Sequence, residues 1–133
     1  MPNHVLVFDL YTVPDLPGIA RAHGLNEADE AAAREALGEK FPKLAFHKIA
    51  CIGALIAERV EGLWLVRSLG APHLGERSEG ELIASFVDRI AELRPPLITF
   101  NGGSFDLPVL RYRAMVNTLS APGLTFRACR SPL

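Results

Sequence analysis

The sequence predicts an α/β domain built on a mixed β-sheet, and three observations support this fold class. Strand-like apolar runs alternate with amphipathic helical segments, which is the order that α/β domains show. Two of these runs follow each other across a short polar connection, which predicts an antiparallel pair. A later apolar run follows a helix, which is how a parallel pairing is made. At 133 residues with 49% hydrophobic content, we expect one domain with its own core.

The first expected strand is the apolar run at residues 4–10, which carries Asp9 close to its end. Pro14, Pro17 and Gly18 follow and break the strand pattern. Because proline and glycine interrupt regular structure, we expect a loop here.

A helix is expected at residues 26–37, where Asn26 can cap the first turn and Gly38 can end the last one. Two apolar runs come next, at residues 46–58 and 62–69. The short polar break between them predicts antiparallel neighbours, with the first run central in the sheet.

The clearest helix is expected at residues 78–93, where apolar side chains recur at helical intervals and Ser78 and Glu81 have capping-box spacing. Residues 97–100 then form a short apolar strand, and a glycine-rich turn leads into a second helix at about residues 104–115. The last stretch, residues 117–133, has no convincing hydrophobic period and is expected to be a loop.

Charge and cysteine content narrow the class of protein. The net charge of −1 predicts no strong basic field, so nucleic-acid binding would need a local basic patch or metal ions. Cys51 and Cys129 lack metal-ligand spacing and are interpreted as reduced thiols, with a disulfide as the alternative. There is no signal peptide, and the apolar run at residues 49–57 is too short to span a membrane. We therefore expect a cytoplasmic protein with no membrane partner.

Two carboxylates occupy comparable places in the predicted sheet. Asp9 lies at the end of the first strand, and Asp106 lies just past the end of the last one. If these strands are adjacent and parallel, both side chains point into one crevice, and a divalent cation would relieve their repulsion. Oxygen ligands favour Mg²⁺ or Mn²⁺. The alternative is that Asp9 forms a turn and Asp106 complements a helix dipole.

Three segments, FDLYTVPD, AFHKIACIGAL and TFNGGSFDLPVLRYRA, together carry a resemblance to a known family. They resemble the 3′–5′ exonucleases related to the exonuclease domain of family-B DNA polymerases, within the ribonuclease H-like, DEDD-type superfamily. The first motif of that family is matched by Asp9, Thr12, Val13, Pro14 and Asp15, and the second by Asn101, Gly102, Phe105, Asp106 and Pro108. The resemblance covers nearly all of residues 4–123.

The resemblance implies a ribonuclease H-like mixed sheet with flanking helices and a metal-dependent hydrolysis of phosphodiesters. Asp9 and Asp106 would be the catalytic residues and the metal ligands, with Mg²⁺ or Mn²⁺ as cofactor. Asn101, Phe105 and Thr12 would contact the partner, the 3′ end of single-stranded DNA or RNA. The alternatives are that Asn101 caps the turn before the helix and that Phe105 packs in the core.

Two departures from the family pattern put activity in doubt. The family has a glutamate two residues after the first aspartate, where this chain has Tyr11, and a phenol is a poor Mg²⁺ ligand. The family's third motif requires a later aspartate, but no acidic residue follows Asp106. Two of four expected acids remain, so we expect impaired activity and weak or absent metal binding. The alternative function is a non-catalytic nucleic-acid-binding or oligomerisation module of the same fold.

Four further residues have competing interpretations. Asp15 either approaches the metal site or stabilises a turn, and the second role is favoured. His47 has no acidic partner in sequence and is expected to be structural. Arg111 and Arg113 either contact phosphate or lie on a solvated helix face, and again the second is favoured.

The family domain normally continues with another strand and a helix that carries the third motif. We therefore interpret residues 1–133 as a single ribonuclease H-like exonuclease domain whose C-terminal part is missing. The strand at residues 97–100 would then be an exposed sheet edge, which invites pairing with another chain. From this we expect a homo-oligomer in which a partner covers the edge.

Overall fold

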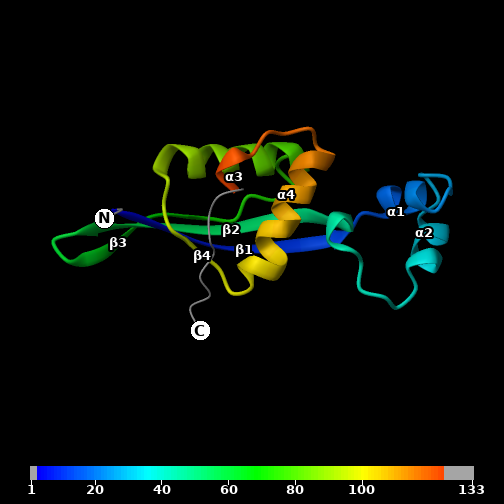
Figure 1. Ribbon diagram of the computed structural model, residues 1–133, viewed down its shortest axis with the longest axis horizontal. Helices are drawn as coiled ribbons and strands as arrows, with labels where there is room; N and C mark the ends of the chain where they lie inside the picture. The colour runs from blue at the N-terminus through cyan, green and yellow to red at the C-terminus, as the bar shows by residue number, and fades with distance from the viewer. Residues whose placement is uncertain (1–2, 125–133) are drawn as a thin grey trace.

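A computed structural model of the chain describes residues 3–124, whose four strands form one mixed sheet in the order β3-β2-β1-β4 (Figure 1). The strands are β1 (His4–Pro14), β2 (His47–Val60), β3 (Leu63–Gly70) and β4 (Leu97–Ile98). β2 pairs antiparallel with both β1 and β3, while β1 and β4 are parallel. The α/β class, the antiparallel pair and the parallel pairing are therefore confirmed. The loss of pattern expected from residue 125 onward, Cys129 included, lies outside the described residues.

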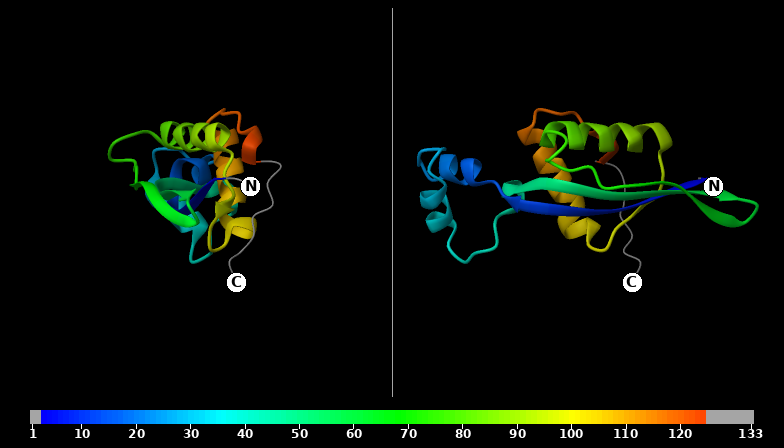
Figure 2. Two further views of the ribbon diagram at one scale, coloured as in Figure 1. Left: turned by 90° about the vertical axis from the view of Figure 1, so that its left-hand side faces the viewer. Right: turned by 180° about the vertical axis from the view of Figure 1, so that it is seen from behind.

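Two helices cover one face of this sheet. α3 (Glu79–Leu93) lies over the sheet and runs roughly along the strands, whereas α4 (Leu107–Val116), next to it, is steeply inclined to them (Figures 1 and 2). Ser78 and Glu81 form the expected capping box at the start of α3. The largest buried side chains of the core come from both helices and from β1 and β2: Leu6, Ile49, Ile52, Leu82, Ile83, Ile90, Leu107, Leu110 and Val109. Burial of these apolar side chains is the main force that holds the helices on the sheet.

The opposite face of β1 is open among the described residues. Side chains alternate along a strand, so Leu6, Phe8 and Leu10 enter the core, while the residues between them point the other way. Of these, Val7 is 38% exposed and Tyr11 is 60% exposed. Asp9 and Tyr11 therefore share the open face, as the period of two predicts.

The prediction of a loop after residue 10 was wrong. β1 continues through Pro14, and a helix, α1 (Leu16–Ala22), follows directly. The prolines do not interrupt this structure because Pro17 lies in the first turn of α1, where its missing N–H has no helical partner to lose. Asp15 caps α1 by accepting a hydrogen bond from the Gly18 N–H, with an N–O distance of 3.1 Å.

The second helix starts later than expected. α2 is Glu30–Leu37, and its N-cap is Asp29, whose carboxylate accepts from the Ala32 N–H at 3.0 Å. Asn26 instead bonds the Ala28 N–H in the turn before the helix. Gly38 ends the helix as predicted, with a φ of 62° that suits glycine. α1 and α2 form a small unit beyond the end of the β1–β2 ribbon (Figure 1), here called the α1–α2 arm.

The chain between the last strand and last helix is also more irregular than expected. β4 ends at Ile98, and residues Gly102–Asp106 form a π-helical turn before α4. The Asn101 carbonyl accepts the N–H groups of both Phe105 and Asp106, which gives the turn its wider winding. The expected loop after α4 contains a short 3₁₀ turn, Pro122–Leu124, because Leu124 is fully buried in the core.

No helix within residues 3–124 is long and apolar enough to cross a membrane.

Candidate functional site

The parallel pairing of β1 and β4 brings the two predicted carboxylates to the same edge of the sheet. Val7 is the register partner of Ile98, where β4 ends. Asp9 is two residues further along β1, and Asp106 belongs to the turn that follows β4. Asp9 is therefore not at the end of its strand, where it was expected, because β1 continues through Pro14. It lies just beyond the stretch of β1 that pairs with β4, on the side where β4 leads into the turn that carries Asp106. Ligands of α/β sheets gather at the carboxyl ends of parallel strands.

Asp106 is buried, with 3% of its surface exposed, and the Thr99 hydroxyl donates a hydrogen bond to its Oδ2 atom. Burial raises the pKa of the Asp106 carboxyl, the bond from Thr99 lowers it, and the charge of Asp9 raises it again. The net effect is a pKa above the usual value. The charge of Asp9 thus disfavours ionisation of Asp106, and a cation near both groups would offset this effect.

Asp9 is exposed on the open face of β1, where one of its oxygens accepts from the Leu10 N–H at 3.0 Å. It lines a shallow hollow of about 480 Å³ together with Tyr11 and apolar residues of all three long strands. Asp9 thus combines free carboxylate surface with an apolar floor, which is a suitable place for a ligand that carries both charge and rings.

The donor set fits one hard cation but not two. Within residues 3–124, no group of three or more His, Cys, Asp or Glu side chains gathers at one place. Tyr11 stands on the same face as Asp9, at the position where a carboxylate would complete the set, and supplies only a phenol. Two carboxylates can bind one Mg²⁺ or Mn²⁺ ion, whereas a two-ion site needs more acidic ligands than the described residues provide.

The three predicted nucleic-acid contacts lie around Asp106 and the end of β1. Asn101 is exposed, and its side-chain oxygen accepts from the Ser104 hydroxyl. Phe105 is half-buried beside Asp106, and its ring meets the imidazole of His47 edge-on at a centroid distance of 5.1 Å. The Thr12 hydroxyl bonds Nδ1 of the same imidazole at 3.0 Å.

His47 is structural, as expected, and its bonds define its tautomer. Nε2 lies 3.0 Å from the Pro42 carbonyl, which can only accept, so Nε2 carries a proton. In the neutral ring, Nδ1 then accepts the hydrogen bond from Thr12. This links the end of β1 to the loop before β2, and places Phe105 against the same ring.

A buried ion network, which the sequence analysis missed, joins the elements that carry the two acids. Arg113 of α4 is 3% exposed, and its guanidinium donates to both oxygens of Glu79, at 2.9 and 2.6 Å. It also donates to the Asp15 carboxylate and to the Ala45 carbonyl, each at 2.8 Å. One side chain therefore connects α4 to α3, to the N-cap of α1 and to the 3₁₀ turn Leu44–Phe46 before β2.

The carboxylate of Glu79 accepts two further hydrogen bonds. The Ile49 N–H donates to Glu79 at 2.7 Å, and the Asn117 amide donates at 3.0 Å. No buried side-chain nitrogen or oxygen within the described residues lacks a hydrogen-bond partner. The network is fully satisfied, which is the condition under which buried charges are tolerated.

The network perturbs the two groups whose charges face each other. Burial raises the pKa of the Asp15 carboxyl, but the hydrogen bond and charge of Arg113, the Gly18 N–H and the charge of Arg21 together hold it below its usual value. Burial lowers the pKa of Arg113, but the hydrogen bonds and charges of Glu79 and Asp15 raise it by more, so the net direction is upward. Asp15 thus stabilises the start of α1 and pairs with α4, which agrees with the favoured structural role.

The expectation for Arg113 was wrong, because it lies neither on a solvated face nor on a surface that could meet phosphate. A signal was present: Val109, Leu110 and Ala114 are buried, and position 113 shares their side of the helix. Arg111 is half-buried and donates two hydrogen bonds to the Leu124 carbonyl, at 2.8 and 2.6 Å. Both arginines hold structure together.

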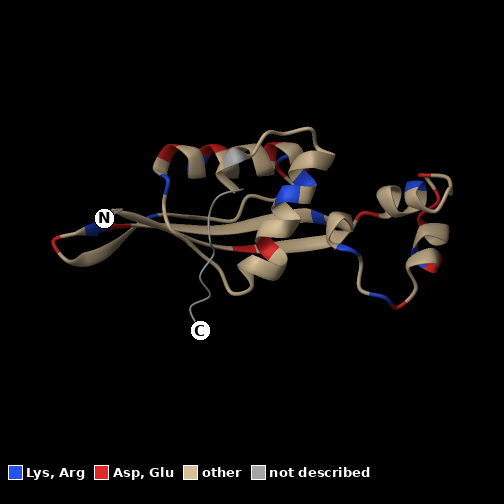
Figure 3. Cartoon of the chain, viewed as in Figure 1, with Lys and Arg blue, Asp and Glu red and all other residues tan. Residues whose placement is uncertain are grey.

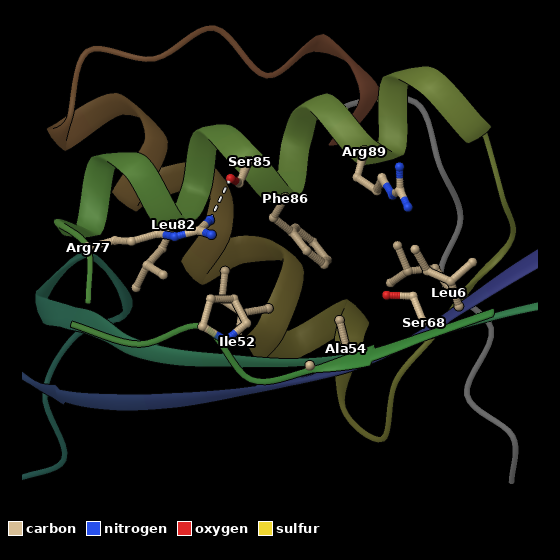
Figure 4. Close-up of a pocket in the computed structure, with 12 residues that line it drawn as sticks. Leu6, Ile52, Ala54, Ser68, Arg77, Leu82, Ser85, Phe86 and Arg89 are labelled. Carbon is tan, nitrogen blue, oxygen red and sulfur yellow. Dashed lines mark hydrogen bonds between the residues drawn. The ribbon is translucent and has the colours of Figure 1, made fainter. Parts of the chain in front are cut away.

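A second cleft, of about 380 Å³, lies between α3 and the β2–β3 part of the sheet (Figure 4). Arg77 and Arg89 stand at its rim, Arg77 donates to the Ser85 hydroxyl at 3.1 Å, and the floor is apolar. No acidic side chain lines it, so it offers neither a metal ligand nor a general base. Figure 3 shows basic and acidic residues spread over the elements, so no single basic face marks a binding surface in that view.

Comparison with known proteins identifies a family that the chain matches. A family described as "Predicted 3′–5′ exonuclease related to the exonuclease domain of PolB" matches residues 39–128, which is more than half of the chain. The matched range contains Asn101, Phe105 and Asp106, whereas β1 with Asp9 lies before it. No curated protein matches the chain.

Proposed function

The chain belongs to the family of predicted 3′–5′ exonucleases related to the exonuclease domain of PolB, and from this premise we propose that it is a metal-dependent exonuclease-like protein with reduced activity. Its substrate class is the 3′ end of single-stranded DNA or RNA. The proposal is supported by the parallel register of β1 and β4, which places Asp9 on the side where β4 leads into the turn of Asp106, and by the charge of Asp9, which raises the pKa of Asp106.

Asp9 and Asp106 would hold one Mg²⁺ or Mn²⁺ ion, which would supply a Lewis acid beside the phosphodiester. Thr99 fixes the orientation of the Asp106 carboxylate by donating to one of its oxygens. The exposed carboxylate of Asp9 supplies the open side of the site. Asn101, Phe105 and Thr12 would position the nucleotide.

Reduced activity follows from the same donor set. Tyr11 offers a phenol instead of a carboxylate on the face that Asp9 occupies, and no acidic residue lies between Asp106 and Leu124, the last described residue. The ion is therefore bound weakly, and a second ion has no site of its own. Activity should respond strongly to any added carboxylate on this face of β1.

A nuclease assay on 5′-labelled single-stranded DNA with Mn²⁺ tests the proposal. We expect slow digestion by the unmodified chain, none by Asp9→Ala, and at least about tenfold faster digestion by Tyr11→Glu, because a third carboxylate would hold the metal more tightly; tenfold corresponds to about 1.4 kcal/mol of barrier. Asp88→Ala is the matched control, since Asp88 is an exposed acid on α3. Digestion that persists unchanged in Asp9→Ala would refute the metal site.

The alternative function is a non-catalytic module that binds nucleic acid or oligomerises through the same fold. The observation that favours it is Tyr11, because the substitution of a ligand by a phenol is what loss of catalysis would leave behind. Binding of oligonucleotide without digestion by the unmodified chain, and without gain in Tyr11→Glu, would favour this function. We also propose a cytoplasmic location, which the free thiol of Cys51 supports.

A further inference from the structure

We propose that Phe41, with the lysines on either side of it, forms a second contact for single-stranded nucleic acid, separate from the Asp9–Asp106 pair. This inference rests on the proposed function and extends it, because it names where the strand continues beyond the carboxylates. The family match covers Phe41, but the sequence assigned no catalytic role and no nucleic-acid contact to it.

Phe41 presents an aromatic ring to solvent where a folded protein has little reason to do so. Its surface is 75% exposed, although it lies in a short loop after α2 rather than at a chain end. The ring is not isolated: its centroid lies 4.7 Å from that of His47 and 6.3 Å from that of Phe105. Together these three rings form a row, here called the aromatic step, from Phe105, the neighbour of Asp106 in sequence, to the exposed ring of Phe41.

The loop that carries Phe41 is held in place by the same imidazole. Nε2 of His47 donates to the carbonyl of Pro42, the next residue in the chain, and Nδ1 bonds Thr12 of β1. The ring of Phe41 is thereby fixed on one side against His47 while its other side stays open. A pre-organised aromatic surface of this kind binds a nucleobase by stacking, with little loss of conformational entropy.

The charges around Phe41 suit a phosphate backbone. Lys40, Lys43 and Lys48 are all the lysines of the chain, so they gather within nine positions of its sequence. Lys40 and Lys43 are exposed, and within residues 3–124 no ion pair joins either of them to an acid. Glu39 is the acidic residue beside them in sequence, so the loop is positive on balance.

A cavity of about 640 Å³ adjoins the loop on the side of the α1–α2 arm. Most of the residues that line it are apolar, Phe41 among them, and His23, Lys40 and Lys43 are its polar lining residues. An apolar hollow with cations in its lining complements a nucleotide, whose base is flat and apolar and whose phosphate is negative.

The position of this surface explains how a chain with net charge −1 would hold nucleic acid. The carboxylates repel phosphate when no cation is bound, so affinity must come from elsewhere. Lys40 and Lys43 are exposed cations one and two residues away from Phe41 in sequence, at the exposed end of the aromatic step. The strand would therefore run from the carboxylates, over Phe105, to Phe41 and the arm.

Fluorescence anisotropy with a labelled oligothymidylate and a labelled oligouridylate, both in EDTA, tests this without hydrolysis. We expect Phe41→Ala to weaken binding by about tenfold, the typical effect of losing one stacked base, and Phe41→Trp to retain it. Trp64→Ala is the matched control, because Trp64 is an aromatic residue on β3 that is 51% exposed. The double variant Lys40→Gln and Lys43→Gln should reduce the salt slope of log Kd by roughly 1.4.

The outcomes separate this inference from the proposed function. Equal binding by Phe41→Ala and the unmodified chain overturns the inference and leaves the proposed function standing. Loss of binding in Phe41→Ala and not in Trp64→Ala supports the inference, whether or not Mn²⁺ produces digestion. Failure of the unmodified chain to bind either oligonucleotide in EDTA overturns the inference, while the digestion assay with Mn²⁺ decides the proposed function separately. Circular dichroism of each variant checks its fold, and the exposure of Phe41 predicts no loss of structure.

Discussion

Substitution of Arg113 by methionine should destabilise the protein more than any single change on its surface. Methionine keeps much of the length and apolar volume of arginine but removes the charge and all five donors. The change leaves Asp15 and Glu79 buried without the cation that faces both of them. The expected result is therefore a loss of folding free energy, not a rearrangement of the fold.

The size of the loss follows from the contacts. Four hydrogen bonds disappear, two to Glu79, one to Asp15 and one to the Ala45 carbonyl. Removing one partner of a buried ion pair costs about 3–5 kcal/mol, because the other charge remains buried. Asp15 keeps its bond from Gly18, and Glu79 keeps those from Ile49 and Asn117, so the cost stays within that range.

Urea denaturation at pH 7, followed by circular dichroism, measures this loss directly. We expect the free energy of unfolding to fall by about 3–5 kcal/mol, which appears as a lower urea midpoint with an unchanged slope. Tm should fall by about 10–20 °C. Arg89→Met is the matched control, because the Arg89 side chain is 48% exposed and its ion pair with Glu92 is 3.5 Å long. An exposed pair of this kind contributes less than about 1 kcal/mol.

A loss in Arg113→Met below about 1 kcal/mol would refute the reasoning, because it would mean that the buried carboxylates do not need the guanidinium. If Arg113→Met does not fold at all, Arg113→Lys answers the question. Lysine retains the charge but cannot form the two-pronged contact with Glu79, so it should fold with an intermediate loss. A lysine variant as unstable as the methionine variant would show that charge is not what the site requires.

Three further predictions concern titration, the candidate site and assembly. The folded-state pKa of Asp15 is below its ordinary 3.8, so the stability that its carboxylate contributes is complete above pH 3.8 and is lost as the pH falls through the lowered pKa. Urea denaturation at a series of pH values from about 2.5 to 7, which spans the range where carboxyls titrate, would show this loss. Thr99→Val should cost about 1–3 kcal/mol at pH 7, since it leaves a buried oxygen of Asp106 without its donor; equal urea midpoints for the two proteins would contradict this. We also propose that a second copy pairs with the β4 edge, and light scattering on dilute protein that finds only a monomer would rule this out.

The elements whose local signals agreed with their environment were predictable from the sequence. α3 combines a capping box with apolar residues at helical spacing, and it forms where these signals place it. The strand pairings followed from the connection lengths, and they brought Asp9 and Asp106 to one edge of the sheet. α1 was missed because proline was interpreted as a breaker, although at the second position of a helix it is compatible with helical structure.

The sequence by itself determined the α/β class and the parallel pairing of β1 with β4, and it predicted the Asp9–Asp106 pair and the shortage of metal ligands that Tyr11 would create. These depend on period, connection length and residue identity, which are local properties. Only the tertiary structure decided that Arg113 is a buried cation shared by Glu79 and Asp15, and that Phe41 stands exposed on the ring of His47. The partners in these contacts lie between 6 and 98 positions apart, so which charge is neutralised and which ring is left open depends on packing that no local pattern contains.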